Sequence, residues 1–346
     1  MKTLYRNAFS LLMFVLLLAA TSAGCTQTAP STDIAPDETA AQGDGTQGSY
    51  AGKKIVYVNS YHEGYAWSDG IEEGLHSILD GTGVELTIIR LDTKQHPEVE
   101  FGQAAGLQAF EQIQALNPDV VITSDDNAQK YLVVPYLKNA GFPLIFLGVN
   151  WDASAYGYTN DITTGMIEVE LPDQLIELLK AYADGERLGY ITIDTETERK
   201  VLDIYNQRFF DGQMQAYWVK TQDEFQAAFL AAQQELDILF MGNNAGSDKW
   251  EEDVMKQFIL QNTVIPTGSI NDWMAPYSLL TLAKSSQEEG EWGGQAALQI
   301  LDGTPVSQIP WVENKRGTVI VNLNLADQLG VVFSPSLLKN AIILDD

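Results

Sequence analysis

The chain has 346 residues, which is enough for two domains of ordinary size with separate hydrophobic cores. Hydrophobic residues make up 45% of it and charged residues 19%, a composition typical of folded rather than disordered proteins. The formal net charge of −27 argues against nucleic acid as a partner, because so acidic a surface repels phosphate backbones.

Residues 1–25 have the pattern of an export signal. Lys2 and Arg6 make the start positive, residues 11–20 form an uninterrupted apolar run, and small residues occupy positions 21–24. The apolar run is too short to cross a bilayer comfortably as a helix. We therefore expect an exported protein that faces the periplasm or the cell exterior.

Cys25 is the only cysteine of the chain, so an internal disulfide is not expected. Ala-Gly-Cys at residues 23–25, directly after the apolar run, resembles the bacterial lipobox, in which the cysteine is lipidated and becomes the new N-terminus. Ser22 stands where the lipobox usually has leucine. The hypothesis is a stable membrane anchor on Cys25; the alternative is ordinary cleavage after Ala23.

Residues 26–51 are rich in Thr, Ser, Pro, Gly, Ala, Gln and Asp and contain no Lys or Arg. Such a segment cannot bury enough apolar surface to order itself, so its composition predicts a flexible tether. Behind a lipidated cysteine, a tether would let a folded body stand away from the membrane.

Short β-rich runs alternate with amphipathic helical stretches from residue 53 onward. Ile71, Leu75 and Leu79, for example, show the spacing of one helix face. The predicted strands are residues 55–58, 84–91, 120–123 and 144–147, and the predicted helices lie around 71–79, 101–116 and 128–139. A second series has strands at 188–193, 215–219, 238–241 and 263–267, with helices at 196–209, 223–234 and 248–260.

This alternation predicts an α/β protein with two doubly wound parallel-sheet lobes, split near residue 165. A strand at 277–283, a helix at 291–301 and a strand at 318–321 would complete the lobes, so the chain would cross between them repeatedly and form a hinge. We assign residues 52–164 and about 280–312 to an N-terminal lobe, and 165–279 and about 313–346 to a C-terminal lobe.

Aromatic and hydrogen-bonding side chains follow the predicted strands, and in open α/β sheets ligands bind outside the carboxyl ends of the strands. Such a mixture supplies stacking area and orienting contacts for a small ligand in a cleft between the lobes. The candidates are Asn59, Ser60, Tyr61, Tyr65, Trp67, Ser124, Asp125, Asn127, Asn150 and Trp151 in the first lobe, and Asp194, Asn243, Asn244, Asp272 and Trp273 in the second.

Purely structural roles remain open for single members of this set. Asp125 follows a strand and precedes a helix, where an aspartate often caps the helix. Asn243 and Asn244 are residue types that favour turns. Trp67 is large enough to belong to a core. The set as a whole is therefore more informative than any one residue.

The segments at residues 59–67, 124–131 and 148–152 resemble the substrate-binding proteins of ABC transporters, in the branch with the type I periplasmic-binding fold. The resemblance extends over residues 53–345 and fits a group of uncharacterised lipoproteins. It implies a small polar or aromatic ligand, delivered to a membrane permease by a protein that we expect to be a monomer. The same domain is similar to sensory modules of some histidine kinases, so signalling to a membrane receptor is the alternative.

Some relatives in this branch are associated with aromatic amino acids, so the resemblance also implies an amino acid as one candidate ligand. Ser60, Ser124 and backbone N–H groups could then bind its carboxylate. Asp125, Asp194 or Asp272 could bind its ammonium group.

The sequence offers no convincing catalytic set. The three histidines, His62, His76 and His96, lack a metal-binding spacing, and neither a phosphate-binding loop nor a nucleophile elbow is found. We therefore expect no metal, no cofactor and no enzymatic activity. A hydrolase that uses Asp125 and Asp272 as paired carboxylates is the less favoured alternative.

Overall fold

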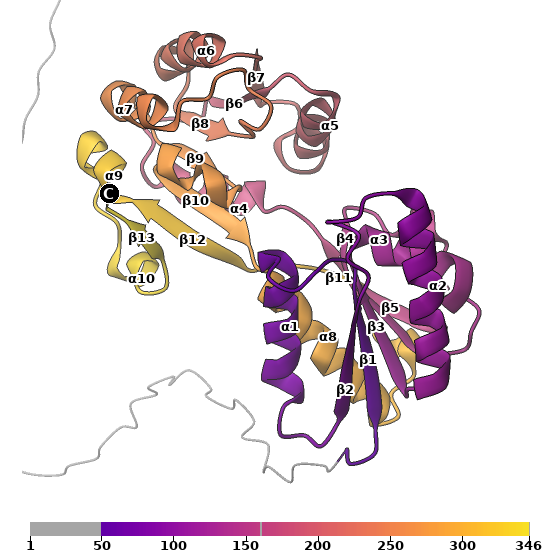
Figure 1. Ribbon diagram of the computed structural model, residues 1–346. Helices are drawn as coiled ribbons and strands as arrows, with labels where there is room; N and C mark the ends of the chain where they lie inside the picture. Colours follow the sequence, from indigo (N-terminus) through magenta and orange to yellow (C-terminus); the bar gives the residue numbers. More distant parts are fainter. Residues whose placement is uncertain (1–49, 160, 346) are drawn as a thin grey trace, which may run out of the picture. The chain divides into compact units, whose positions relative to one another are not determined.

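β1 (Lys54–Asn59) shows why the first sheet is covered on both faces. Ile55 and Tyr57 belong to one buried cluster, whereas Val56 and Val58 belong to another, because successive side chains of a strand point to opposite faces. In the computed structural model, which describes residues 50–159 and 161–345, the covering helices are α1 (Ala66–Leu79) and α8 (Ser286–Leu301) on one face and α2 (Val99–Leu116) with η1 (Gln129–Leu137) on the other (Figure 1).

The first sheet has six strands, all paired in parallel. Their spatial order is β11 (Val312–Glu313), β5 (Thr163–Glu168), β4 (Leu144–Asn150), β3 (Val120–Ser124), β1 and β2 (Glu85–Arg90). Short helical segments lie next to three of the strands: α3 (Asp125–Ala128) follows β3, η2 (Ser154–Tyr156) follows β4, and η5 (Val306–Gln308) precedes β11.

The second sheet has seven strands, and β12 runs antiparallel to β10 while the other described pairings are parallel. Their order is β13 (Ile342–Leu344), β12 (Gly317–Asn322), β10 (Leu280–Lys284), β9 (Thr267–Ser269), β8 (Ile238–Met241), β6 (Leu188–Ile193) and β7 (Gln215–Val219). Its helices are α4 (Pro172–Lys180), α5 (Glu196–Tyr205), η3 (Asn206–Phe210), α6 (Gln222–Glu235), α7 (Glu252–Asn262), η4 (Asp272–Tyr277), α9 (Leu323–Leu329) and α10 (Pro335–Leu338).

Three crossovers connect the two sheets: they follow β5, β10 and β11. The first and third crossovers are joined by the Asn314 side chain. It accepts a hydrogen bond from the Val169 N–H at 2.6 Å and donates one to the Val169 carbonyl at 3.0 Å. The first and second are joined by an ion pair between Glu168 and Lys284. The two-lobe α/β fold predicted from the sequence is therefore confirmed, with β10, α8 and β11 crossing back and forth.

α1 and α8 pack with their backbones in direct proximity, because both are glycine where they meet. A methyl group at Gly290 would lie 2.0 Å from the carbonyl oxygen of Ile71, and one at Gly74 would lie 2.9 Å from the Gly290 Cα. Only glycine fits at such a distance. The contact brings the N-terminal ends of the two helices, which carry Trp67 and Ser286, to the same edge of the first sheet.

Three predicted boundaries differ from the structure. Tyr50, which the predicted tether of residues 26–51 includes, belongs to the folded body, since its N–H donates to the Thr82 carbonyl at 3.0 Å and its hydroxyl donates to Asp302 at 2.9 Å. The split between residues 164 and 165 falls inside β5, which pairs with β4 as far as Glu168. Residues 280–284, assigned to the first lobe, form β10 of the second sheet.

The predicted helix at 128–139 is instead a short α-helical turn followed by the π-helix η1. Pro135 lies inside η1, and a proline removes a backbone donor from the usual ladder. β5, α4, β11, α9, α10 and β13 were not predicted. No helix formed by the described residues has the length and apolar character needed to cross a bilayer.

Candidate ligand-binding site

A cavity of about 560 Å³ opens at the carboxyl ends of strands from both sheets, next to the first two crossovers. Its volume lies in the range of small-molecule sites. We call Tyr61, Tyr65, Trp67, Asp125 and Asn150 the first wall, and Ile270, Asn271, Asp272, Trp273 and Leu282 the second wall. Glu168, Glu170, Leu171, Ala283, Lys284 and Ser286 come from the crossover regions, and Ala66 completes the lining.

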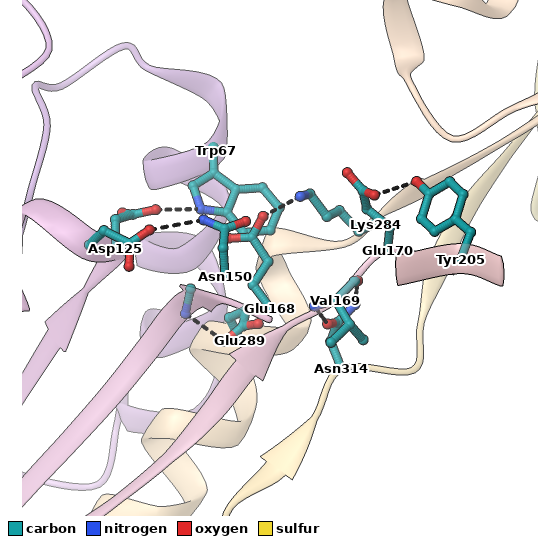
Figure 2. Close-up of polar contacts among 12 residues, drawn as sticks. Trp67, Asp125, Asn150, Glu168, Val169, Glu170, Tyr205, Lys284, Glu289 and Asn314 are labelled. Carbon is teal, nitrogen blue, oxygen red and sulfur yellow. Dashed lines mark hydrogen bonds and ion pairs between the residues drawn. The ribbon is translucent and has the colours of Figure 1, made fainter. Parts of the chain in front are cut away.

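The first wall is aromatic and internally connected. Tyr61 and Tyr65 contact edge to face with ring centroids 5.1 Å apart, an arrangement that aromatic pairs favour. α1 begins one residue after Tyr65, and the Trp67 indole N–H on its first turn donates to Asp125 Oδ1 at 3.0 Å (Figure 2). The indole is thus fixed in orientation while its ring remains half-buried.

Asp125 begins α3 directly after β3 and has a φ of +63°, a backbone conformation that aspartate tolerates better than most residues. Its side chain is only 4% exposed, and Oδ2 is buried without a hydrogen bond among the described residues. Burial raises the pKa of Asp125 well above its usual value, and the negative charge of Glu168 raises it further. The site thus holds a carboxyl group that takes up a proton easily.

Glu168 and Lys284 form an ion pair at the floor of the cavity (Figure 2). Burial raises the pKa of Glu168, while the charge of Lys284 opposes that rise. Burial lowers the pKa of Lys284, but the charges of Glu168 and Glu170 outweigh it, so that its pKa lies above the usual value. Lys284 Nζ also lies 5.4 Å from the centroid of the Trp67 ring, within the range of a cation–π contact.

Glu289 supports the first wall from behind. Its Oε2 accepts a hydrogen bond from the Gly148 N–H at 3.1 Å, while its Oε1 is buried without a partner among the described residues. Burial raises the pKa of Glu289 well above its usual value, and the charges of Glu168 and Asp125 add to this although the Gly148 N–H opposes it. Gly148 has a φ of +62°, and a methyl group there would lie 3.2 Å from Asp125 Oδ1.

The second wall contains more hydrocarbon and is less firmly held. Ile270 and Leu282 are buried, whereas the Trp273 side chain is 52% exposed. Asp272 Oδ1 accepts a hydrogen bond from the Trp273 N–H at 2.7 Å, and Asn271 Nδ2 donates to the Gly242 carbonyl at 3.2 Å. The exposed indole lies where η4 begins, directly after β9.

Seven of the residues proposed from the sequence line this cavity: Tyr61, Tyr65, Trp67, Asp125, Asn150, Asp272 and Trp273. Four others, Asn59, Ser60, Ser124 and Asn127, hold the loops in place and are not part of the lining. Asn59 bonds Glu72 and the Tyr61 N–H, and Asn127 bonds Thr93.

Ser60 and Ser124 do not line the cavity either, because their hydroxyl groups are already used. The Ser60 hydroxyl donates to the Ser124 carbonyl and accepts from the Ala128 N–H at 2.7 Å. The Ser124 hydroxyl bonds the hydroxyl of Tyr57 at 2.8 Å. Both side chains are fully buried, so the carboxylate-binding role considered for them has no support in this structure.

Trp151, Asp194, Asn243 and Asn244 also lie outside the lining. Trp151 packs against the core of the second lobe, with Arg208 over its ring at 5.2 Å. Asp194 forms an ion pair with Arg199 at 2.6 Å. The two asparagines organise the turn after β8: Asn243 Oδ1 accepts from the Ala245 N–H, and the Asn244 carbonyl accepts from the Ser247 N–H.

Sequence reasoning missed the crossover residues Glu168, Glu170 and Lys284, together with Ile270 and Asn271. The last two lie in the predicted loop after β9 and could have been included. Cys25 lies outside the described residues. Within residues 50–159 and 161–345, no group of His, Cys, Asp and Glu side chains is arranged to hold a metal ion.

No protein-family model matches the chain, and no curated protein matches it. A substrate-binding protein with adhesive properties from Clostridium difficile, solved ligand-free and open, is similar at a TM-score of 0.63 and 18% identity, over 84% of this chain and 99% of that one.

Two further solved structures match with lower scores. An ABC domain in complex with L-Trp from Streptococcus pneumonia matches at a TM-score of 0.49 and 16% identity, over 84% and 99% of the two chains. A periplasmic ribose ABC transporter protein from Conexibacter woesei matches at 0.49 and 15%, over 82% and 97%. The chain has the fold of the type I periplasmic-binding proteins of ABC transporters, as its sequence predicted.

Proposed function

We propose that the protein is an extracytoplasmic solute receptor that captures a small polar or aromatic ligand between its two walls. The observation that carries this proposal is the cavity of about 560 Å³ at the carboxyl ends of strands from both sheets, bounded by two of the crossovers. Ligand contacts with both walls would favour one arrangement of the lobes over others, which is how a ligand shifts a conformational equilibrium.

The receptor would act as a monomer that hands its ligand to the permease of an ABC importer. Export by residues 1–25 and a lipid on Cys25 would hold it at a membrane, with residues 26–49 as the tether. The fold supports this assignment, because the similar Clostridium difficile protein is described as a substrate-binding protein. We propose no catalytic step, since Glu168 pairs with Lys284 and Glu170 accepts a hydrogen bond from the Tyr205 hydroxyl.

A thermal-shift screen against amino acids, amines, sugars and nucleosides tests the receptor function, because a ligand that binds only the folded state raises its stability. At a hundred times its dissociation constant, a ligand adds about 2.7 kcal/mol to the free energy of unfolding. We expect a stabilising ligand to be recovered unchanged and to compact the protein in small-angle scattering. Turnover of the ligand would instead indicate a hydrolase.

The anchor and the receptor can be tested separately. Cys25→Ala should release the protein from membranes in a fractionation experiment and leave the ligand dissociation constant unchanged. The Cys25→Ala protein found in the membrane fraction would contradict the lipid anchor without affecting the receptor proposal.

A further inference from the structure

The cavity is strongly acidic. Four carboxyl groups line it, from Asp125, Glu168, Glu170 and Asp272, and Lys284 is the one base among the described lining residues. The whole chain has a formal net charge of −27, so the long-range field has the same sign as the local one. Such a field concentrates cations and repels anions.

Lys284 is not available to an anionic ligand, because it already neutralises Glu168. The Glu168 side chain is 6% exposed and that of Lys284 27% exposed, so the pair is largely removed from water. A ligand carboxylate that captured Lys284 would leave Glu168 buried without its partner, and this is far less favourable than the intact pair. Among the described residues that line the cavity, no basic group is therefore left free for a carboxylate or a phosphate.

The aromatic rings of the first wall already face ammonium groups. Lys284 Nζ lies 5.4 Å from the Trp67 ring centroid. Lys94 Nζ lies 5.3 Å from the ring centroid of Tyr61 and 5.0 Å from that of Tyr65. These contacts show that the electron-rich faces of this wall are placed to stabilise positive charge. Trp273 offers a fourth ring, which is 52% exposed.

Asp125 supplies a buried carboxyl group, and the described residues leave its second oxygen without a partner. The described residues give it the Trp67 N–H on one oxygen and no hydrogen bond on the buried other oxygen. A cation nearby would favour the ionised form of this carboxyl group. Resting on the receptor function above, we propose that the ligand is an organic cation: an amine with net positive charge and an apolar or aromatic portion that lies against Trp67 and Trp273.

Isothermal titration calorimetry with four indole compounds that carry different charged groups tests this proposal. The probes share an indole and differ in their charged groups: tryptamine carries an ammonium group, tryptophol carries none, indole-3-propionate carries a carboxylate, and L-tryptophan carries both. We expect tryptamine to bind at least about tenfold more tightly than the other three, since about 1.4 kcal/mol corresponds to a factor of ten. Added salt should weaken tryptamine binding, because screening reduces interactions between charges.

Variants of the acidic residues locate the effect. Asp272→Asn and Asp125→Asn should each weaken tryptamine binding several-fold more than tryptophol binding, because only tryptamine carries a positive charge. Asp194→Asn removes the same charge outside the cavity and should change neither. Asp272 is exposed, so its variant gives a result even where the buried Asp125→Asn fails to fold.

Two kinds of failure are distinguishable. Tighter binding of the zwitterionic, neutral or anionic probe, or of a sugar in the wider screen, would overturn the cationic ligand and keep the receptor function. Absence of binding by every probe and by every compound of the wider screen would overturn both.

Discussion

The two walls of the cavity are built on different physical principles. The first wall rests on buried polar groups: Trp67 bonds Asp125, and Glu289 bonds the Gly148 N–H behind it. The second wall rests on hydrocarbon from Ile270 and Leu282 and carries an indole that is half exposed. If the cavity binds a ligand as proposed, the first wall is formed before the ligand arrives, whereas Trp273 would gain burial on binding.

The largest expected effect comes from breaking the ion pair under the first wall. Lys284→Met leaves Glu168 buried without a partner, and we expect the free energy of unfolding to fall by about 3 kcal/mol. Chemical denaturation measures this loss. The double variant Lys284→Met/Glu168→Gln should recover most of the lost free energy of unfolding. An equal loss in the single and the double variant would show that the broken ion pair is not the cause.

The helix contact behind the first wall should be the next most sensitive. Gly290→Ala places a methyl group 2.0 Å from the Ile71 carbonyl oxygen, so α8 must move away from α1. We expect destabilisation by about 2 kcal/mol. Gln295→Ala, on the exposed side of the same helix, is the control and should change stability by less than about 0.5 kcal/mol.

The two tryptophans compare the walls directly. Trp67→Ala removes a half-buried ring that packs on the first core and bonds Asp125, so both the melting temperature and the ligand affinity should fall. Trp273→Ala should weaken binding by about 1.4 kcal/mol, or tenfold, and leave the melting temperature nearly unchanged, because its ring is 52% exposed.

Trp67→Phe keeps a ring and loses the N–H, so it separates stacking from the Asp125 hydrogen bond. Calorimetric scans and binding titrations on the same samples provide both quantities. Equal stability losses in the Trp67→Ala and Trp273→Ala variants would contradict the proposed difference between the walls.

The smallest effect concerns pH. Because the pKa of Glu289 is raised on folding, the folded protein keeps a proton that the unfolded chain releases near its ordinary pKa. The free energy of unfolding should therefore fall as the pH rises above that ordinary value, by at most about 1.4 kcal/mol per pH unit for one proton. Glu289→Gln removes this contribution.

Denaturation of the two proteins at a series of pH values measures the change in slope. The slope should become shallower in Glu289→Gln without vanishing, because Asp125 shows the same direction of pKa shift next to Glu168 and Asp126. Identical slopes in the two proteins would mean that Glu289 is ionised in the folded state.

The sequence predicted most of the first wall because a general rule applies there. Tyr61, Trp67 and Asp125 follow β1 and β3, and Asn150 is the last residue of β4. These strands are neighbours or one strand apart in the first sheet, so their carboxyl ends meet at one edge. In the second sheet the same rule selected Asp194 as well as Asp272, but only Asp272 lines the cavity. Asp194 follows β6, which is separated from β9 by β8, and the alternation of apolar runs does not reveal the order of the strands.

Glu168 and Lys284 could not be found in this way. Each stands where a strand leaves one sheet and the chain enters the other lobe, so neither belongs to a strand–loop–helix unit. Their pairing also joins positions that are remote in the sequence, and only the three-dimensional path of the crossovers brings them together. The burial of Glu289 could not be predicted from the sequence either, because α8 follows the α/β repeats as an isolated helix.

The path of the chain also determines when folding can finish. α8 and β11 belong to the first lobe but are synthesised after nearly the whole second lobe, and β12 and β13 of the second sheet come later still. A growing chain therefore leaves the glycine face of α1 uncovered until residue 290 has been synthesised, and such long-range pairing delays folding. Neither lobe can be completed before most of the chain is available.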